Sequence, residues 1–117
     1  MLKTKRVYED AKTGDGVRFL VERLWPRGIK KEELKMKAWL KDVAPSPDLR
    51  KWFAHDADKW QEFQKRYRAE LKANPEAWKP IIEAAKHGNV TLLYSARDME
   101  HNSALLLKSF LDKRLKK

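Results

Sequence analysis

Apolar residues recur at intervals of three and four along the chain from residue 46 onward, which is the pattern of amphipathic helices. We expect a short helix after Ser46, a good N-cap that precedes Pro47. Three longer helices are predicted: one from Asp56 or Asp58, one from Asn74 and Pro75 to Gly88, and one from about Asp98 to Arg114. Their buried stripes are expected at Leu49, Trp52 and Phe53; at Trp60, Phe63, Tyr67 and Leu71; at Trp78, Ile81, Ile82 and Ala85; and at Leu106, Leu107, Phe110 and Leu111.

Runs of strand-forming residues indicate a sheet. Strands are predicted at 5–9, 17–23 and 90–94, and the ambiguous stretch 36–43 is assigned to a strand rather than a helix. Because the strand at 90–94 lies between two predicted helices, it fits an α/β layer with parallel pairing. We therefore expect one compact α/β domain over residues 1–117, with a small, mostly parallel sheet packed by helices.

The composition fits a folded core and narrows the chemistry. Hydrophobic residues make up 42% of the 117 residues and include five tryptophans, which argues against disorder despite 38% charged residues. Cysteine is absent, which excludes disulfides, zinc–thiolate sites and a thiol nucleophile. The first ten residues contain no apolar stretch, and no run approaches the ~20 residues of a membrane span. We expect a soluble, cytoplasmic protein that is not a membrane protein.

The formal net charge of +10 is spread along the chain. A basic balance favours anionic partners such as nucleic acid, nucleotides or phosphorylated metabolites. The alternative is a lysine-rich surface that only keeps the protein soluble, since no dense basic run with interleaved aromatic residues occurs.

The segment 94–102 joins a buried strand to the start of a helix, where free N–H groups and the helix dipole favour anions. With Asp98 as the N-cap, His101 and Asn102 would fall in the first turn. The residues expected to line an anion site here are Tyr94, Ser95, Arg97, His101 and Asn102. The alternative is local capping alone.

Two further segments carry candidate binding residues. Arg23 and Arg27 flank Trp25 after a predicted strand, so two guanidiniums and a stacking ring are available; the alternative is an Arg23–Glu pair beside a core tryptophan. Ser46, most simply a cap, and Arg50 open the short helix, and His55 beside Asp56 is a candidate general base. The three histidines show no HxxxH or HExxH spacing, and no glycine-rich phosphate loop or GxSxG motif occurs, so neither a metal site nor a cofactor is predicted.

Several of these motifs resemble one known family. They are 15–28 with its WPRG sequence, 44–56, 60–71, and 90–102 with its His101-Asn102 pair. Together they resemble the YeaO-like branch of domain-of-unknown-function family 488, over about residues 6–111. The resemblance implies a small bacterial or archaeal α/β domain and no particular activity. Other branches look to carry a Cys-His-Arg run after the last strand, where this chain has Glu100-His101-Asn102-Ser103, so thiol chemistry does not transfer.

The leading hypothesis is a cleft that binds, or acts on, a small anionic ligand such as a phosphoester or nucleotide. In it the arginines clamp the ligand, His101 or His55 transfers protons, and helix N–H groups stabilise negative charge. The alternatives are a nucleic-acid-binding module and a protein-interaction module without chemistry. The sequence predicts neither the oligomeric state nor whether turnover occurs.

Overall fold

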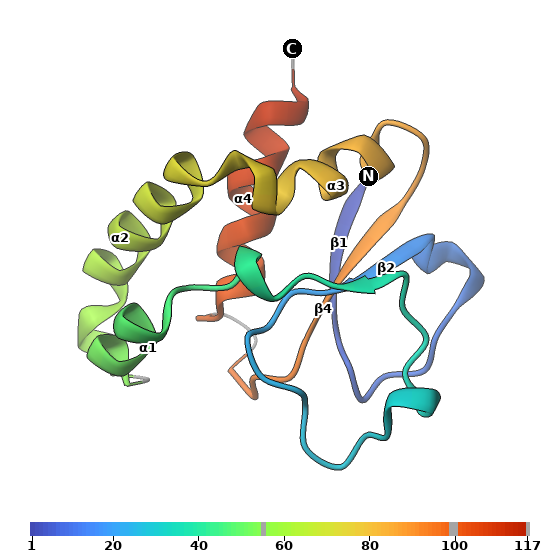
Figure 1. The fold of residues 1–117 in the computed structure, drawn as a ribbon, viewed down its shortest axis with the longest axis horizontal. Helices are drawn as coiled ribbons and strands as arrows, with labels where there is room; N and C mark the ends of the chain where they lie inside the picture. Colours follow the sequence, from blue (N-terminus) through green and yellow to red (C-terminus); the bar gives the residue numbers. More distant parts are fainter. Residues whose placement is uncertain (55, 99–100, 117) are drawn as a thin grey trace.

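Parallel pairing of four strands organises the computed structural model, which describes every residue except 55, 99–100 and 117. The strands are β1 (Leu2–Arg6), β2 (Val17–Leu20), β3 (Ala38–Trp39) and β4 (Val90–Tyr94). Their order across the described sheet is β1-β4-β2-β3, and every pair is parallel (Figure 1). The α/β class and the mostly parallel sheet are therefore confirmed.

The central strand β4 is buried along its whole length because both faces of the sheet are covered. On one face Val90, Leu92 and Tyr94 join the large core cluster, which also contains residues of all four α-helices. On the other face Leu93 belongs to a smaller cluster with Leu20, supplied mainly by the loop between β2 and β3. The sheet is thus packed by helices on one face and by a loop on the other.

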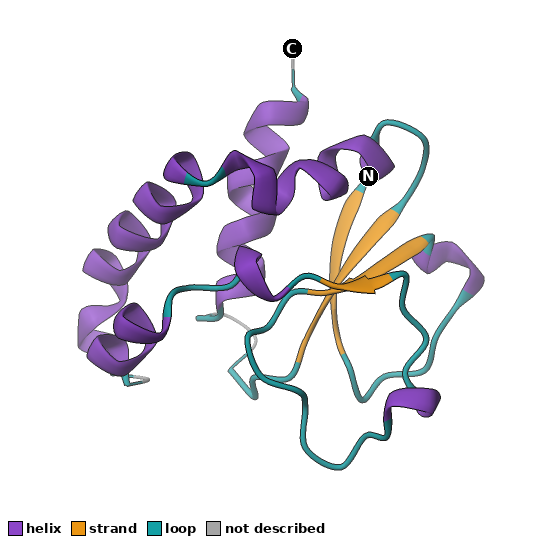
Figure 2. Ribbon diagram, in the orientation of Figure 1, coloured by secondary structure: helices purple, strands orange, loops and turns teal. Residues whose placement is uncertain are grey.

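Four α-helices gather on one side of the strands (Figure 2). They are α1 (Pro47–Phe53), α2 (Trp60–Ala73), α3 (Pro75–Ala85) and α4 (Ser103–Leu115). The predicted stripe on α2 is confirmed at Phe63, Tyr67 and Leu71, which are buried. Ser46 caps α1 as predicted, because its hydroxyl accepts a hydrogen bond from the Leu49 N–H.

Several predicted strand boundaries are wrong. The first strand starts at Leu2 rather than at residue 5, because Leu2 enters the helical core and pairs with Val90, while a turn follows Arg6. The second strand ends at Leu20 instead of residue 23. Of the stretch 36–43 only Ala38–Trp39 is strand, because β2 itself ends at Leu20, whose carbonyl accepts from the Leu40 N–H at 2.8 Å; a 3-10 helix follows at Lys41–Val43.

A buried ionic cluster ties β1, β2 and β4 together near the amino end of the sheet. The Asp15 carboxylate accepts from Lys5 at 2.9 Å, from the Lys12 N–H at 3.1 Å and from Arg18, and the Asp15 carbonyl accepts from the Thr91 hydroxyl at 2.8 Å. Burial alone raises the pKa of Asp15, but the hydrogen bonds from Lys5, Lys12 and Arg18 outweigh it and lower the pKa to about 2.

We expect Asp15→Asn to lower the free energy of unfolding at pH 7 by about 3 kcal/mol, because it leaves Lys5 and Arg18 without their buried counter-charge. The Asp15 pKa is lower in the folded than in the unfolded chain, so its contribution is complete above pH 4 and disappears as the pH falls toward 2.

Denaturant melts of the wild type and Asp15→Asn at pH 7, 4 and 2 measure this difference. Asp10→Asn, at an exposed position of the same loop, is the matched control and should change little. A wild-type advantage that is the same at pH 2 as at pH 7 would contradict the proposed role of the charge.

Candidate functional site

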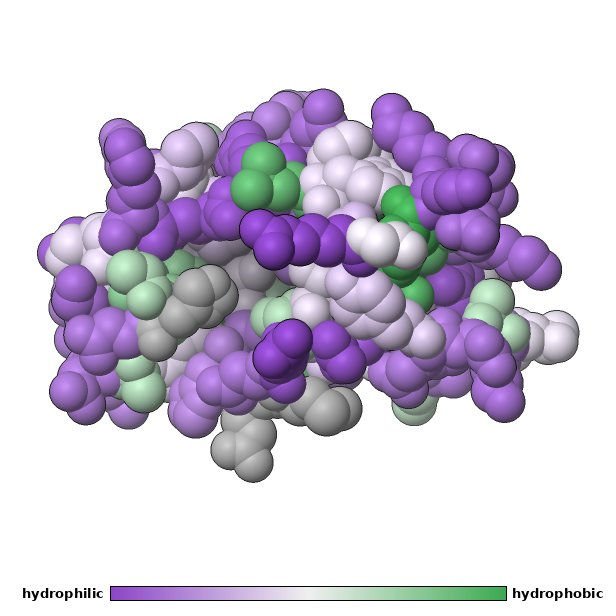
Figure 3. All heavy atoms as spheres, turned by 90° about the horizontal axis from the view of Figure 1, so that it is seen from below, coloured by the Kyte–Doolittle hydropathy of each residue, from purple (hydrophilic) through white to green (hydrophobic). Residues whose placement is uncertain are grey.

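A cavity of about 890 Å³ opens where the carboxyl ends of β1, β4 and β2 meet the first turns of α1 and α4. Because the strands are parallel, these ends lie at one edge of the sheet, the position at which open α/β sheets bind ligands. Figure 3 views the molecule from below Figure 1: hydrophilic side chains surround a hollow whose interior is paler. The sequence-predicted residues that line the cavity are Arg23, Trp25, Arg27, Arg50, Tyr94, Ser95, Arg97, His101 and Asn102.

The start of α4 differs from the prediction that Asp98 is its N-cap. The helix begins at Ser103, and the buried Asn102 caps it: the Asn102 Oδ1 accepts from the Leu105 N–H at 3.0 Å, and Nδ2 donates to the Asp98 carbonyl at 3.0 Å. The Asp98 carboxylate accepts from the His101 N–H at 2.9 Å, ahead of the helix. His101 and Asn102 therefore precede the first turn, and the amide of Asn102 is used by the fold.

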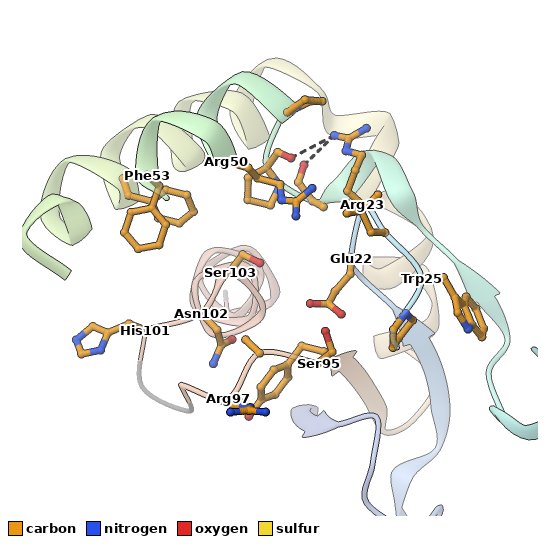
Figure 4. A pocket seen from close by; sticks show the side chains of 18 of the residues that line it. Glu22, Arg23, Trp25, Arg50, Phe53, Ser95, Arg97, His101, Asn102 and Ser103 are labelled. Carbon is orange, nitrogen blue, oxygen red and sulfur yellow. Dashed lines mark hydrogen bonds between the residues drawn. The ribbon is translucent and has the colours of Figure 1, made fainter. Parts of the chain in front are cut away.

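His101 lies at the margin of the cavity. Its Nδ1 is 3.0 Å from the Asp98 carboxylate, and its ring meets Trp60 edge-on at 5.2 Å. In Figure 4 the imidazole is at the far end of the cavity from Glu22 and Trp25. The second predicted histidine, His55, lies outside the described residues.

Two arginines of the cavity hold backbone segments in place. Arg6 donates to the carbonyls of Ser95 and Ala96 at 3.2 and 3.1 Å, which fixes the chain leaving β4. Arg23 donates to the Ala44 and Pro45 carbonyls at 3.2 and 3.4 Å, as the dashed lines in Figure 4 show. Its ion pair, at 3.4 Å, is with Asp42 and not with a neighbouring glutamate.

The remaining cations of the cavity have no such partners. Within the described part of the chain, the side chains of Arg27, Arg50, Lys51 and Arg97 make no hydrogen bond or ion pair, and all four are exposed. Figure 4 shows Arg50 entering from the α1 side and Arg97 from the segment after β4. These side chains are available to an anion.

Aromatic side chains form much of the apolar wall. Phe53 packs on Phe63 with ring centroids 4.4 Å apart, and Trp60 stacks on Phe63 at 5.4 Å. Trp25 donates its indole N–H to the Ile29 carbonyl at 2.6 Å, which fixes the ring beside the cavity. Burial raises the pKa of the Tyr94 phenol, so this side chain is a neutral hydroxyl.

The structure separates Ser46 from this site and adds Glu22. The Ser46 hydroxyl donates to Glu70 at 2.6 Å and accepts from Leu49, and it does not line the cavity. Glu22 lines the cavity, although it was not among the candidate site residues predicted from the sequence. Its position two residues after a parallel strand was the feature of the sequence that could have predicted its place in the cavity.

Neither a metal site nor a membrane span is found in the described residues. No group of three or more His, Asp or Glu side chains within 1–54, 56–98 and 101–116 is placed to hold a metal ion. Over the same ranges, no helix has the length and apolar character needed to cross a bilayer.

The fold and cavity define a small α/β protein with a cation-lined pocket at the carboxyl edge of a parallel sheet. The family model described as "Inactive DUF488-N3 subclade" matches residues 1–117. The chain is 43% identical over 110 residues to "Uncharacterized protein YeaO" of Escherichia coli K12, covering 94% of this chain and 96% of the relative. It is 36% identical over 113 residues to "Uncharacterized protein Mb3100c" of Mycobacterium bovis, covering 97% and 95%.

The chain belongs to the DUF488 family, in the subclade that this model describes. The resemblance seen in the sequence motifs is therefore confirmed. No solved structure matches the chain.

We expect Asn102→Ala to lower the free energy of unfolding by about 2 kcal/mol, because it removes the cap of α4 and leaves the Leu105 N–H without its acceptor. Thermal or denaturant melts measure the loss. Asn74→Ala is a matched control, since Asn74 also precedes a helix but its side chain makes no capping bond. Equal losses in the two variants would show that the Asn102 contacts add nothing to stability.

Proposed function

We propose that this protein binds a small phosphorylated ligand, such as a nucleotide, in the cavity at the carboxyl edge of the sheet and does not turn it over. The observation that carries the proposal is the excess of cations around one cavity. The side chains of Arg27, Arg50, Lys51 and Arg97 lack partners within the described structure, and the two carboxylates of the lining are Glu22 and Asp48.

This arrangement favours phosphate for two physical reasons. Guanidinium groups bind phosphate through paired, charge-assisted hydrogen bonds. In addition, a recess lined by one sign of charge concentrates the electric field and attracts ions of the opposite sign. Arg6 and Arg23 add to that potential even though they donate hydrogen bonds to main-chain carbonyls.

The size and walls of the cavity favour an organic phosphate. A volume of about 890 Å³ lies within the range of roughly 300–1,000 Å³ that small-molecule sites occupy. Its aromatic side chains, among them Trp25, Phe53 and Trp60, offer rings against which a base or sugar can pack. Inorganic phosphate alone would leave these walls without contacts.

Binding without turnover agrees with the description of the family model and with the contacts of His101. The matching subclade is described as inactive. The chain has no cysteine, and His101 is engaged by Asp98 and Trp60 at the margin of the cavity. Catalysis by His101 or His55, the other part of the sequence hypothesis, lacks comparable support.

Isothermal titration of the full chain with inorganic phosphate, AMP and a short single-stranded RNA, at low and moderate salt, tests the proposal. We expect AMP to bind with a dissociation constant that rises about tenfold in Arg50→Gln and in Arg97→Gln, since each variant removes one charge-assisted hydrogen bond. Arg68→Gln is the matched control, because Arg68 lies on α2 and is not part of the cavity lining.

Binding of AMP that is unaffected by both cavity variants would contradict the proposal. Binding of RNA alone, lost steeply between low and moderate salt, would instead favour the nucleic-acid hypothesis. Conversion of AMP over long incubation would contradict the absence of turnover.

A further inference from the structure

Glu22 is placed in the cavity by the backbone of β2. The Val21 N–H continues the pairing by donating to the Leu93 carbonyl at 3.2 Å. The Glu22 carbonyl then accepts from the Trp39 indole at 2.6 Å, which fixes the main chain at this residue. As a result the carboxylate projects into the cavity, between Arg50 on one side and Ser95 on the other (Figure 4).

One oxygen of this carboxylate lacks a hydrogen-bond donor. Glu22 Oε1 is buried and has no partner among the described residues, and Arg23 Nε is in the same condition. A buried polar atom without a partner is unfavourable and rare in folded proteins. Because an ionised carboxylate has only acceptor sites, the group missing here is a donor.

The neighbouring cations do not supply this donor. Arg23 directs its two Nη groups to the carbonyls of Ala44 and Pro45 and to Asp42, and its Nε makes no hydrogen bond to Glu22. The side chains of Arg50 and Arg97 make no hydrogen bond within the described structure, to Glu22 or to any other group. The other oxygen, Oε2, also makes no hydrogen bond in the described structure and is not buried, so it is the atom of this carboxylate that a ligand in the cavity can reach. A carboxylate left unpaired among free cations fits a cavity whose ligand provides both an anion and a donor.

We propose that the ligand carries an O–H or N–H donor beside its anionic group, and that this donor binds Glu22. The inference deepens the function proposed above and rests on it. It restricts the ligand to a phosphorylated sugar or nucleotide, and it disfavours inorganic phosphate and polyphosphate, whose added negative charge Glu22 repels. A buried acceptor discriminates strongly against analogues that lack the donor.

The test compares ligands in wild type, Glu22→Ala and Glu22→Gln by isothermal titration. The probes are inorganic phosphate, ribose 5-phosphate, AMP and 2′,3′-dideoxyadenosine monophosphate. For Glu22→Ala we expect at least tenfold weaker binding of AMP, together with unchanged or tighter binding of inorganic phosphate, because a repelling charge is gone. Glu22→Gln keeps the side-chain volume, and its affinity for AMP should lie between those of wild type and Glu22→Ala. Melts of each variant confirm that it is folded.

Asp48→Ala is the matched control, since Asp48 is the other carboxylate of the lining and is exposed. It changes the charge by the same amount, and we expect it to shift the affinities for AMP and for inorganic phosphate alike, toward tighter binding. If the dideoxy ligand binds wild type as weakly as phosphate, the donor is a ribose hydroxyl. If it keeps both the affinity of AMP and the sensitivity to Glu22→Ala, the donor is the amino group of the base.

Two results overturn the inference, and they are distinguishable. If wild type binds AMP and phosphate equally, or Glu22→Ala shifts every ligand as Asp48→Ala does, Glu22 acts only through its charge, while the proposed anion site stands. If wild type binds none of the probes, the proposed function fails and this inference fails with it.

Discussion

The position of β4 between β1 and β2, parallel to both, is the constraint on which the rest of the structure depends. Backbone pairing with two neighbours fixes the register of all three strands and buries β4 on both faces. Since the strands run in one direction, the segments that leave them emerge at the same edge. The cavity is a consequence of this arrangement, because those segments and the starts of α1 and α4 diverge there.

The cations around the cavity divide into two groups that the sequence alone does not distinguish. Arg6 and Arg23 donate hydrogen bonds to main-chain carbonyls and so fix the backbone around the pocket. The second group consists of residues whose side chains make no hydrogen bond or ion pair within the described structure: Arg27, Arg50, Lys51 and Arg97. Both groups contribute to one electrostatic potential, so the framework of the site already favours an anion. Glu22 and Asp48 are the two carboxylates of the lining, and Glu22 is the half-buried one, which is why its chemistry is informative.

Local patterns predicted much of the fold, and non-local contacts decided the remainder. The stripe of α2 and the strand at 90–94 follow from periodicity and composition within a few residues. The ends of the strands did not follow from the local sequence, because they depend on how far the neighbouring strand continues the backbone pairing. Asp98 and Asn102 are equally good caps by type, and tertiary geometry selected Asn102. Most candidate site residues do meet, since strand-end residues in parallel sheets converge; Ser46 does not, because Glu70, 24 positions away, holds it.

The use of carbonyl oxygens as acceptors for Arg6 and Arg23 affects how the pocket responds to its surroundings. A main-chain carbonyl does not titrate in the physiological range, and no side-chain substitution deletes it. The backbone segments that these contacts fix should therefore keep their positions over a wide pH range. Among related chains, only a substitution of the arginine removes such a contact. A substitution at position 44, 45, 95 or 96 that fits the local packing should leave these contacts in place as long as the backbone path is retained.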